Sequence, residues 1–238
     1  MREQSVEFVS AGRTLAGFLA EPDAPPANPR PAVMVLHGGS GLGAHERDRA
    51  SRLAELGYVA FAPDIFGEVF TSREHGIATI TNLVGDPPKL RSRLTDALGY
   101  LRARPSVDPE RTAAIGFCFG GLAALELARS GADLRAVVSF HGGLTTRAPA
   151  VPGVVKAALL ICTGAADPFT PREHRGALED EMTRAEVDWQ IHVYGGAEHG
   201  FTERVPAGKP QRPGVRYDEV ADRRSWAAMR DLLSDRLG

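Results

Sequence analysis

The chain has 238 residues, of which 43% are hydrophobic and 24% charged, and its formal net charge is −2. These values are typical of a globular protein with one hydrophobic core and exclude a long disordered tail. A charge so close to neutral argues against nucleic acid or an anionic membrane surface as the main partner and favours a small-molecule ligand.

The N-terminal residues carry no export or membrane signal. Met1 to Ala20 alternates polar and apolar residues and lacks the basic start, apolar run and cleavage site of a signal peptide. No segment approaches the roughly 20 apolar residues of a membrane span, and Cys118 and Cys162 lie in separate apolar runs. We expect one domain over residues 1–238, located in the cytoplasm with reduced thiols. The sequence specifies no oligomeric state.

The first predicted elements are a hairpin, a buried strand and a helix. Residues 5–9 and 14–20 alternate with a period of two around Gly12, which is typical of a β-hairpin at a sheet edge. Residues 32–36 form a continuous apolar run, as in a strand buried on both faces. Residues 46–56 then show helical spacing, and Gly57 ends the helix.

The rest of the chain alternates strands with helices. Strands are predicted at 58–62, 112–117, 135–140, 157–163 and 188–194, and helices at 89–102, 119–130, 171–183 and 218–237. This alternation indicates an α/β fold with a mostly parallel central sheet, helices on both faces and ligands at the carboxyl ends of the strands. The long, glycine-containing segment 64–88 has no readable pattern and is a candidate cap over the site.

One motif carries chemistry. Gly116-Phe117-Cys118-Phe119-Gly120-Gly121 follows a predicted buried strand and opens a helix. This is the nucleophile-elbow pattern of the α/β-hydrolase fold with cysteine in place of serine, and its glycines permit the sharp turn. The helix N-terminus favours a thiolate at Cys118. The alternative is that Cys118 is a small buried hydrophobe in a tight turn.

Two further residues complete a triad in the chain order of this fold, which is nucleophile, acid, histidine. Asp167 follows the predicted strand 157–163, and His199 follows the last strand. Alternatively, Asp167 caps the next helix and His199 is a solvated loop residue.

An oxyanion hole is expected from backbone N–H groups of Gly39 and Phe119. In this fold the donors are the residue after the nucleophile and one in the loop after the third strand, where His37-Gly38-Gly39 matches the HGG-type sequence of esterases. These glycines could instead form only a tight turn. The remaining histidines show no metal-ligand spacing, so we expect no metal. The glycine-rich residues 38–43 lack the Gly-Lys-Ser/Thr ending of a phosphate-binding P-loop, so we expect no cofactor.

With these residues in hand, the chain resembles the dienelactone hydrolase family from about residue 5 to its C-terminus. The resemblance is carried by the elbow at 116–121, Ala-Pro-Asp at 62–64, Asp167 and Glu-His-Gly-Phe at 198–201, and by Tyr217-Asp218 leading to Ser225-Trp226. It implies a cytosolic, cofactor-free hydrolase that opens a small ester or lactone through a cysteine acyl-enzyme.

The chain departs from this family at two positions. Dienelactone hydrolases carry a glutamate after the third strand that helps to activate the thiol, and Gly38 stands there in this chain. They also hold a substrate carboxylate with arginines, and the nearest counterpart here is Arg204. The resemblance therefore makes Gly38 and Arg204 the candidate substrate-binding residues. Glu68 and Glu198 are candidates to replace the absent carboxylate.

The expected mechanism is attack of the Cys118 thiolate on an ester or lactone carbonyl, with His199 as base and Asp167 orienting it. Two alternatives remain open. A thioesterase or acyltransferase would use the same triad with another leaving group or acceptor, and a binding protein on the hydrolase scaffold would not be acylated at all.

Overall fold

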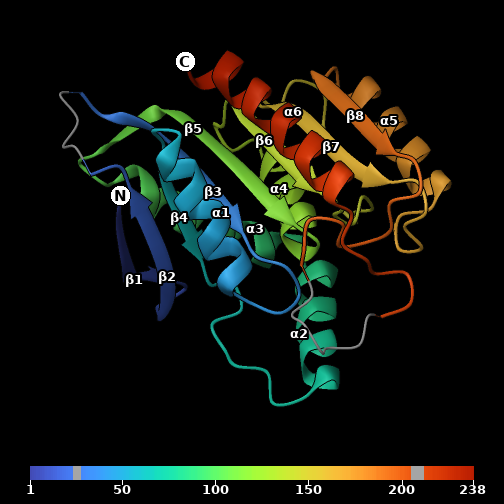
Figure 1. Ribbon diagram of the computed structural model, residues 1–238, viewed down its shortest axis with the longest axis horizontal. Coiled ribbons are helices and arrows are strands. Elements are labelled where there is room, and N and C mark those ends of the chain that lie inside the picture. The colour runs from blue at the N-terminus through green and yellow to red at the C-terminus, as the bar shows by residue number, and fades with distance from the viewer. Residues whose placement is uncertain (24–27, 205–211) are drawn as a thin grey trace.

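The structure, a computed structural model, describes residues 1–23, 28–204 and 212–238. Within these residues eight strands form one sheet that is bordered by six helices (Figure 1). The strands are β1 (Arg2–Ser10), β2 (Arg13–Glu21), β3 (Arg30–Leu36), β4 (Val59–Pro63), β5 (Val107–Phe117), β6 (Ala136–Phe140), β7 (Ala158–Gly164) and β8 (Trp189–Tyr194). The helices are α1 (Ala44–Glu55), α2 (Arg73–Gly85), α3 (Pro87–Arg102), α4 (Phe119–Arg129), α5 (Arg172–Arg184) and α6 (Glu219–Leu237).

The sheet is mostly parallel, as the alternation of strands and helices predicts. Its order is β1-β2-β4-β3-β5-β6-β7-β8, and all pairs from β4 to β8 are parallel. The predicted N-terminal hairpin is confirmed, because β1 and β2 pair antiparallel across Ala11 and Gly12. Both turn residues have positive φ, at 48° and 73°, which matches the right-handed twist of the strands.

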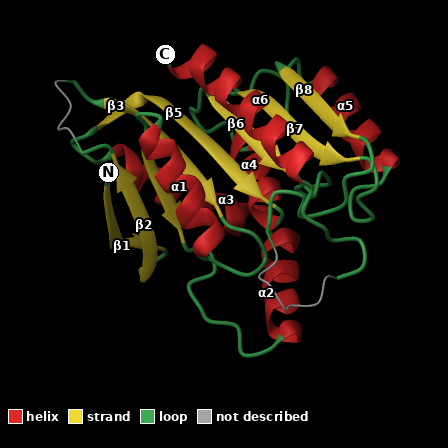
Figure 2. Ribbon diagram, in the orientation of Figure 1, coloured by secondary structure: helices red, strands yellow, loops and turns green. Residues whose placement is uncertain are grey.

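The helices cover both faces of the sheet, which is the predicted architecture (Figure 2). On one face Leu53 of α1 and Met229 of α6 belong to the same buried cluster as Val35 of β3. On the other face Leu94 of α3 and Leu125 of α4 are equally buried. Each such side chain stabilises the fold by about 1.5–3 kcal/mol. Burial on both faces fixes the central strands, and therefore the positions of their carboxyl ends.

A buried ion network fixes α4 against α5. The Arg129 side chain has no solvent exposure, and its Nε and Nη2 donate to the two carboxylate oxygens of Glu181, each at 2.9 Å. Its Nη1 donates to Glu126 at 3.1 Å. Bidentate guanidinium–carboxylate pairs define geometry as well as charge. The network therefore fixes the C-terminal end of α4 against α5.

Segment 64–88 contains the helix α2, although no pattern in these residues predicts one. Only Gly76 and Leu83 of α2 are buried, so no apolar stripe of helical period marks it. A local signal was present, because the Ser72 side chain caps the helix by accepting from the His75 N–H at 3.1 Å. α2 lies beyond the carboxyl ends of the central strands (Figure 1). No helix in the described ranges is long and apolar enough to cross a membrane.

Candidate active site

Cys118 occupies a sharp turn between β5 and α4, with φ 53° and ψ −115°. The turn is possible only because glycines surround it. A side chain on Gly116 would overlap the Gly120 carbonyl, and one on Gly120 would overlap the Leu36 carbonyl of β3. A side chain on Gly121 would stand 2.6 Å from Ser139 Oγ. The strained backbone therefore lifts Cys118 above the sheet, as an elbow does.

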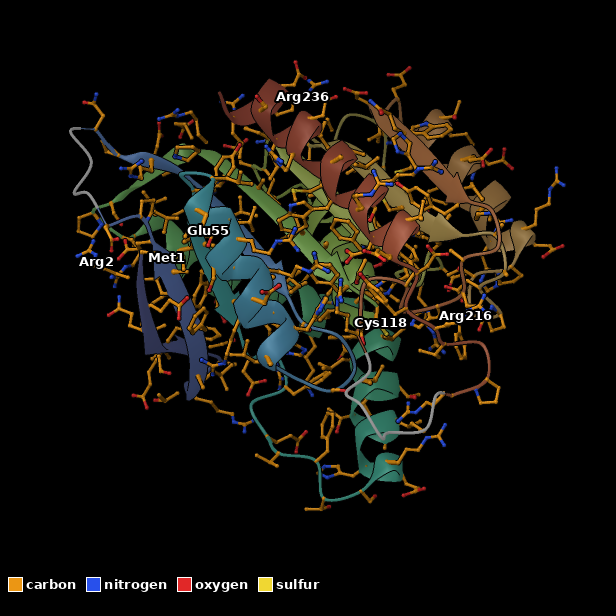
Figure 3. The ribbon with its side chains drawn as sticks, viewed as in Figure 1. Met1, Arg2, Glu55, Cys118, Arg216 and Arg236 are labelled. Atoms are coloured by element: carbon orange, nitrogen blue, oxygen red, sulfur yellow. The ribbon has the colours of Figure 1, made fainter. Side chains whose placement is uncertain are left out.

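The structure brings Cys118, His199 and Asp167 together from three loops. The Cys118 Sγ lies 3.1 Å from His199 Nε2, and His199 Nδ1 lies 2.9 Å from Asp167 Oδ2. The other Asp167 oxygen accepts the Phe169 N–H at 2.8 Å. Figure 3 shows Cys118 where the carboxyl ends of the central strands face α2. The three residues thus form one continuous chain of polar contacts at the expected edge of the sheet.

The surroundings of His199 favour its charged form. Burial lowers its pKa, but the hydrogen bonds to Asp167 and Cys118 outweigh burial and raise the pKa from 6.5 to about 10. The Asp167 side chain has no solvent exposure, so its charge acts on the ring with little screening. The arrangement is suited to a thiolate–imidazolium pair.

The loop after β3 is held by polar contacts. Glu46 of α1 accepts the Gly38 N–H at 3.2 Å and the Gly43 N–H at 3.0 Å. In the described ranges the N–H groups of Gly39 and Phe119 have no hydrogen-bond partner, so both are free to donate to a ligand. Glu46 was missed in the sequence, although its place in the first turn of a helix is where a carboxylate meets free N–H groups.

His37 ties this loop to the start of segment 64–88. Its Nδ1 lies 2.8 Å from the Gly38 carbonyl, and its Nε2 accepts the Ile65 N–H at 2.9 Å. Aromatic rings continue from there, because Phe66 packs against His37, Phe70 and Phe119 at centroid distances of 4.5–5.0 Å. The site is therefore bordered on the α2 side by aromatic surface.

A half-buried carboxyl group, that of Glu203, lies near Cys118, and the sequence analysis did not identify it. A side chain on Gly38 would stand 3.4 Å from Glu203 Oε1 and 3.6 Å from Cys118 Cβ. Burial and the nearby Glu46 raise the pKa of Glu203. Glu68 and Glu198 lie elsewhere: Glu68 pairs with His75, and Glu198 pairs with Arg216 at 3.3 Å. Nothing in the spacing showed that the loop after His199 returns toward Gly38.

Arg204 is exposed, and its guanidinium lies 4.7 Å from the centre of the Tyr217 ring. Together with Arg52 and Trp226 it lines a groove of about 380 Å³ between α1 and α6. The structure therefore places Gly38 next to Cys118 and Arg204 against Tyr217.

The second cysteine lies apart from this chemistry. Cys162 on β7 is fully buried, and burial raises the pKa of its thiol to about 12. Its closest polar neighbour is the Tyr194 hydroxyl, 3.7 Å away. Cys162 is therefore a protonated core residue.

Comparison with known proteins gives one consistent result. The model of the dienelactone hydrolase family matches residues 15–237. A putative carboxymethylenebutenolidase of Synechocystis sp. is 31% identical, covering 94% of this chain and 92% of its own. Two solved structures each cover 100% of this chain and 99% of their own. They are m3DLH, with 38% identity and a TM-score of 0.92, and a dienelactone hydrolase-like promiscuous phosphotriesterase from metagenomic libraries, with 40% identity and a TM-score of 0.89.

Proposed function

Because this chain belongs to the dienelactone hydrolase family and is an ester or lactone hydrolase, we propose that it works through a covalent acyl-enzyme on Cys118. The observation that carries the proposal is the unbroken contact from Cys118 Sγ through His199 to the buried Asp167. The nucleophile, the base and the residue that orients the base are thereby assigned to these three side chains.

In the first step the Cys118 thiolate attacks the substrate carbonyl carbon, and a C–S bond forms as the carbonyl oxygen becomes an oxyanion. The N–H groups of Gly39 and Phe119 donate to that oxygen. The intermediate then collapses, the C–O bond to the leaving group breaks, and the leaving oxygen takes a proton from the His199 imidazolium. In a lactone the leaving alcohol stays attached to the acyl chain.

In the second step the neutral His199 takes a proton from water, which attacks the thioester carbonyl. The C–S bond breaks and the thiolate returns, paired again with the imidazolium. Asp167 keeps the proton on His199 Nδ1 throughout, so that Nε2 always faces sulfur or water. The carboxylic acid leaves, and no cofactor or metal takes part in this mechanism.

On the substrate side, we assign Gly38 to the acyl group, because a Cβ at this position would lie only 3.6 Å from Cys118 Cβ. Arg204 remains a proposed contact for a negatively charged substrate at the rim. It would have to leave the Tyr217 ring to reach one.

The test is a panel of p-nitrophenyl esters and unsaturated lactones, assayed with wild type and Cys118→Ala. Cys162→Ala is the matched control, since it removes the other, buried thiol. We expect Cys118→Ala to be inactive, Cys118→Ser to be severely slowed but folded, and Cys162→Ala to retain activity. Wild-type rates in Cys118→Ala would refute the proposal.

The same panel separates the alternatives. A thioester and an alcohol acceptor are added, because faster thioester cleavage or acyl transfer to the alcohol would favour a thioesterase or acyltransferase. A phosphotriester is added because one similar protein is described as a phosphotriesterase. Complete absence of acylation by every activated ester would favour a binding role.

A further inference from the structure

A third histidine, His141, lies between the nucleophile and the loop that carries His199. It follows β6 directly, is fully buried and has a positive φ of 40°. Its ring centre lies 5.2 Å from that of His199 and 5.0 Å from that of Phe201. A buried polar side chain in a strained backbone conformation next to an active site calls for a functional explanation.

The hydrogen bonds of His141 determine its protonation state. The Cys118 N–H donates to His141 Nδ1 at 3.2 Å, and it also donates to the Phe140 carbonyl at 3.0 Å. Because a backbone N–H can only donate, Nδ1 must be unprotonated. Nε2 then carries the hydrogen and donates to Thr202 Oγ1 at 2.8 Å. His141 is thus held as one neutral tautomer that uses both nitrogens.

The surroundings of His141 also favour its neutral form. Besides burial, His199, His45 and Arg49 lower the pKa of His141, and they outweigh a backbone hydrogen bond that raises it. Cys118, the proposed thiolate, also lies next to the ring, but it contacts Nδ1 through its backbone N–H. Burial, followed by His199, lowers the pKa of His141 well below 6.5. His141 therefore does not compete with His199 for a proton in the working pH range.

These contacts connect Cys118 with the loop that carries His199. One end of His141 holds the backbone of Cys118, whose φ of 53° is strained, and the other holds Thr202, three residues after His199. Arg49 fixes the same loop from α1 by donating to the Thr202 carbonyl at 3.0 Å. We propose that His141 is a positioning residue, which sets the distance between Cys118 Sγ and His199 Nε2 by tying the nucleophile's backbone to the histidine loop. This inference rests on the proposed function of Cys118 and His199.

The test uses three variants that cut the link at one end or at both. His141→Ala removes both contacts. Thr202→Val removes the contact with His141 Nε2 and leaves a side chain of nearly the same shape. His141→Asn keeps an acceptor oxygen near the position of Nδ1, and asparagine tolerates a positive φ. His192→Ala on β8, a half-buried histidine outside the site, is the matched control.

Two readouts separate positioning from simple loss of structure. They are kcat and KM with a p-nitrophenyl ester, and the pH midpoint of iodoacetamide alkylation of Cys118. We expect Thr202→Val to lower kcat about five- to tenfold at unchanged KM, the effect of losing one buried hydrogen bond. His141→Ala loses both bonds and should lower kcat at least as much. Both variants should raise the alkylation midpoint, because a longer sulfur–nitrogen distance weakens the pair. His141→Asn retains only the Cys118 contact and should therefore match Thr202→Val, and His192→Ala should match wild type.

The inference is overturned if Thr202→Val keeps the wild-type kcat and alkylation midpoint. It is also overturned if folded variants lose kcat while their alkylation midpoint stays at the wild-type value. Thr202→Val decides the matter if His141→Ala does not fold. Cys118→Ala is measured in the same series. Activity in that variant would refute the proposed function itself, whereas an inactive Cys118→Ala beside normal His141 and Thr202 variants refutes only the positioning role.

Discussion

Replacing Asp167 by Asn removes the negative charge that holds His199 in its cationic form. Raising the pKa of His199 from 6.5 to about 10 corresponds to roughly 5 kcal/mol in favour of the imidazolium, at about 1.4 kcal/mol per pH unit. Asp167 and Cys118 share this stabilisation. If Asp167 contributes about half of it, its loss reduces the population of the thiolate–imidazolium pair about 10²-fold. The Asn amide would also donate to Nδ1 and so turn a hydrogen on Nε2 toward sulfur. The total expected loss in turnover is on the order of 10⁴-fold.

The assay is the rate of iodoacetamide alkylation of ligand-free protein against pH. In wild type the midpoint should lie well below the value of about 8.5 for a free cysteine. It should rise in Asp167→Asn and His199→Ala. The second thiol does not interfere, because the pKa of Cys162 is raised to about 12, and Cys118→Ala supplies the blank. Turnover of an activated ester is measured on the same preparations.

Two results would refute this reasoning. A wild-type midpoint at or above about 8.5 would show that Cys118 is not ionised in the free protein. A loss in Asp167→Asn below tenfold would leave Asp167 only its bond to the Phe169 N–H, which is a loop-capping role.

Three further predictions concern the residues around the triad. Gly39→Val should lower kcat about 10²–10³-fold, because a bulky residue misplaces the oxyanion donor. The melting temperature should change little, because a Cβ at Gly39 would meet only the flexible end of Ile80, at 3.2 Å; equal losses in both would make Gly39 a turn residue. Gly120→Ala should destabilise by at least about 3 kcal/mol in a denaturant titration, because its Cβ would overlap the Leu36 carbonyl, and a wild-type unfolding midpoint would contradict this. Glu203 has a raised pKa, so it binds more protons in the folded chain than in the unfolded chain. Its contribution to the free energy of folding therefore becomes less favourable as the pH rises through and above 4.5. Glu203→Gln should therefore gain more melting temperature over wild type at pH 8 than at pH 4.5, and the reverse order would contradict the burial of this charge.

Much of the fold could be predicted from local patterns. Continuous apolar runs marked the buried strands β3, β6 and β7, and the glycines at 116, 120 and 121 marked the elbow. These features can be recognised in the sequence because each depends only on residues that are close together along the chain. The helix α2 was not predicted, because it buries too few residues to show a helical period.

The site was predictable only where chain order determines position. Cys118, Asp167 and His199 each follow a strand, so their meeting at one edge of the sheet could be expected. Glu203 and His141 could not be assigned in this way. Glu203 lies near Cys118 because the loop after His199 folds back toward Gly38. His141 also follows a strand, but its contacts depend on the side chain turning inward, and sequence spacing does not encode that direction.

The isolation of Cys162 determines how this protein responds to oxidants. A reactive thiolate at Cys118 would be converted by peroxide to a sulfenic acid, which is normally rescued when a second thiol condenses with it to form a disulfide. Cys162 is the only other cysteine in the chain, and it is buried and protonated at neutral pH. It cannot serve as that second thiol without local unfolding. If Cys118 is the proposed thiolate, recovery from peroxide therefore depends on an external thiol, and without one a second equivalent of peroxide oxidises the sulfenic acid to sulfinic acid.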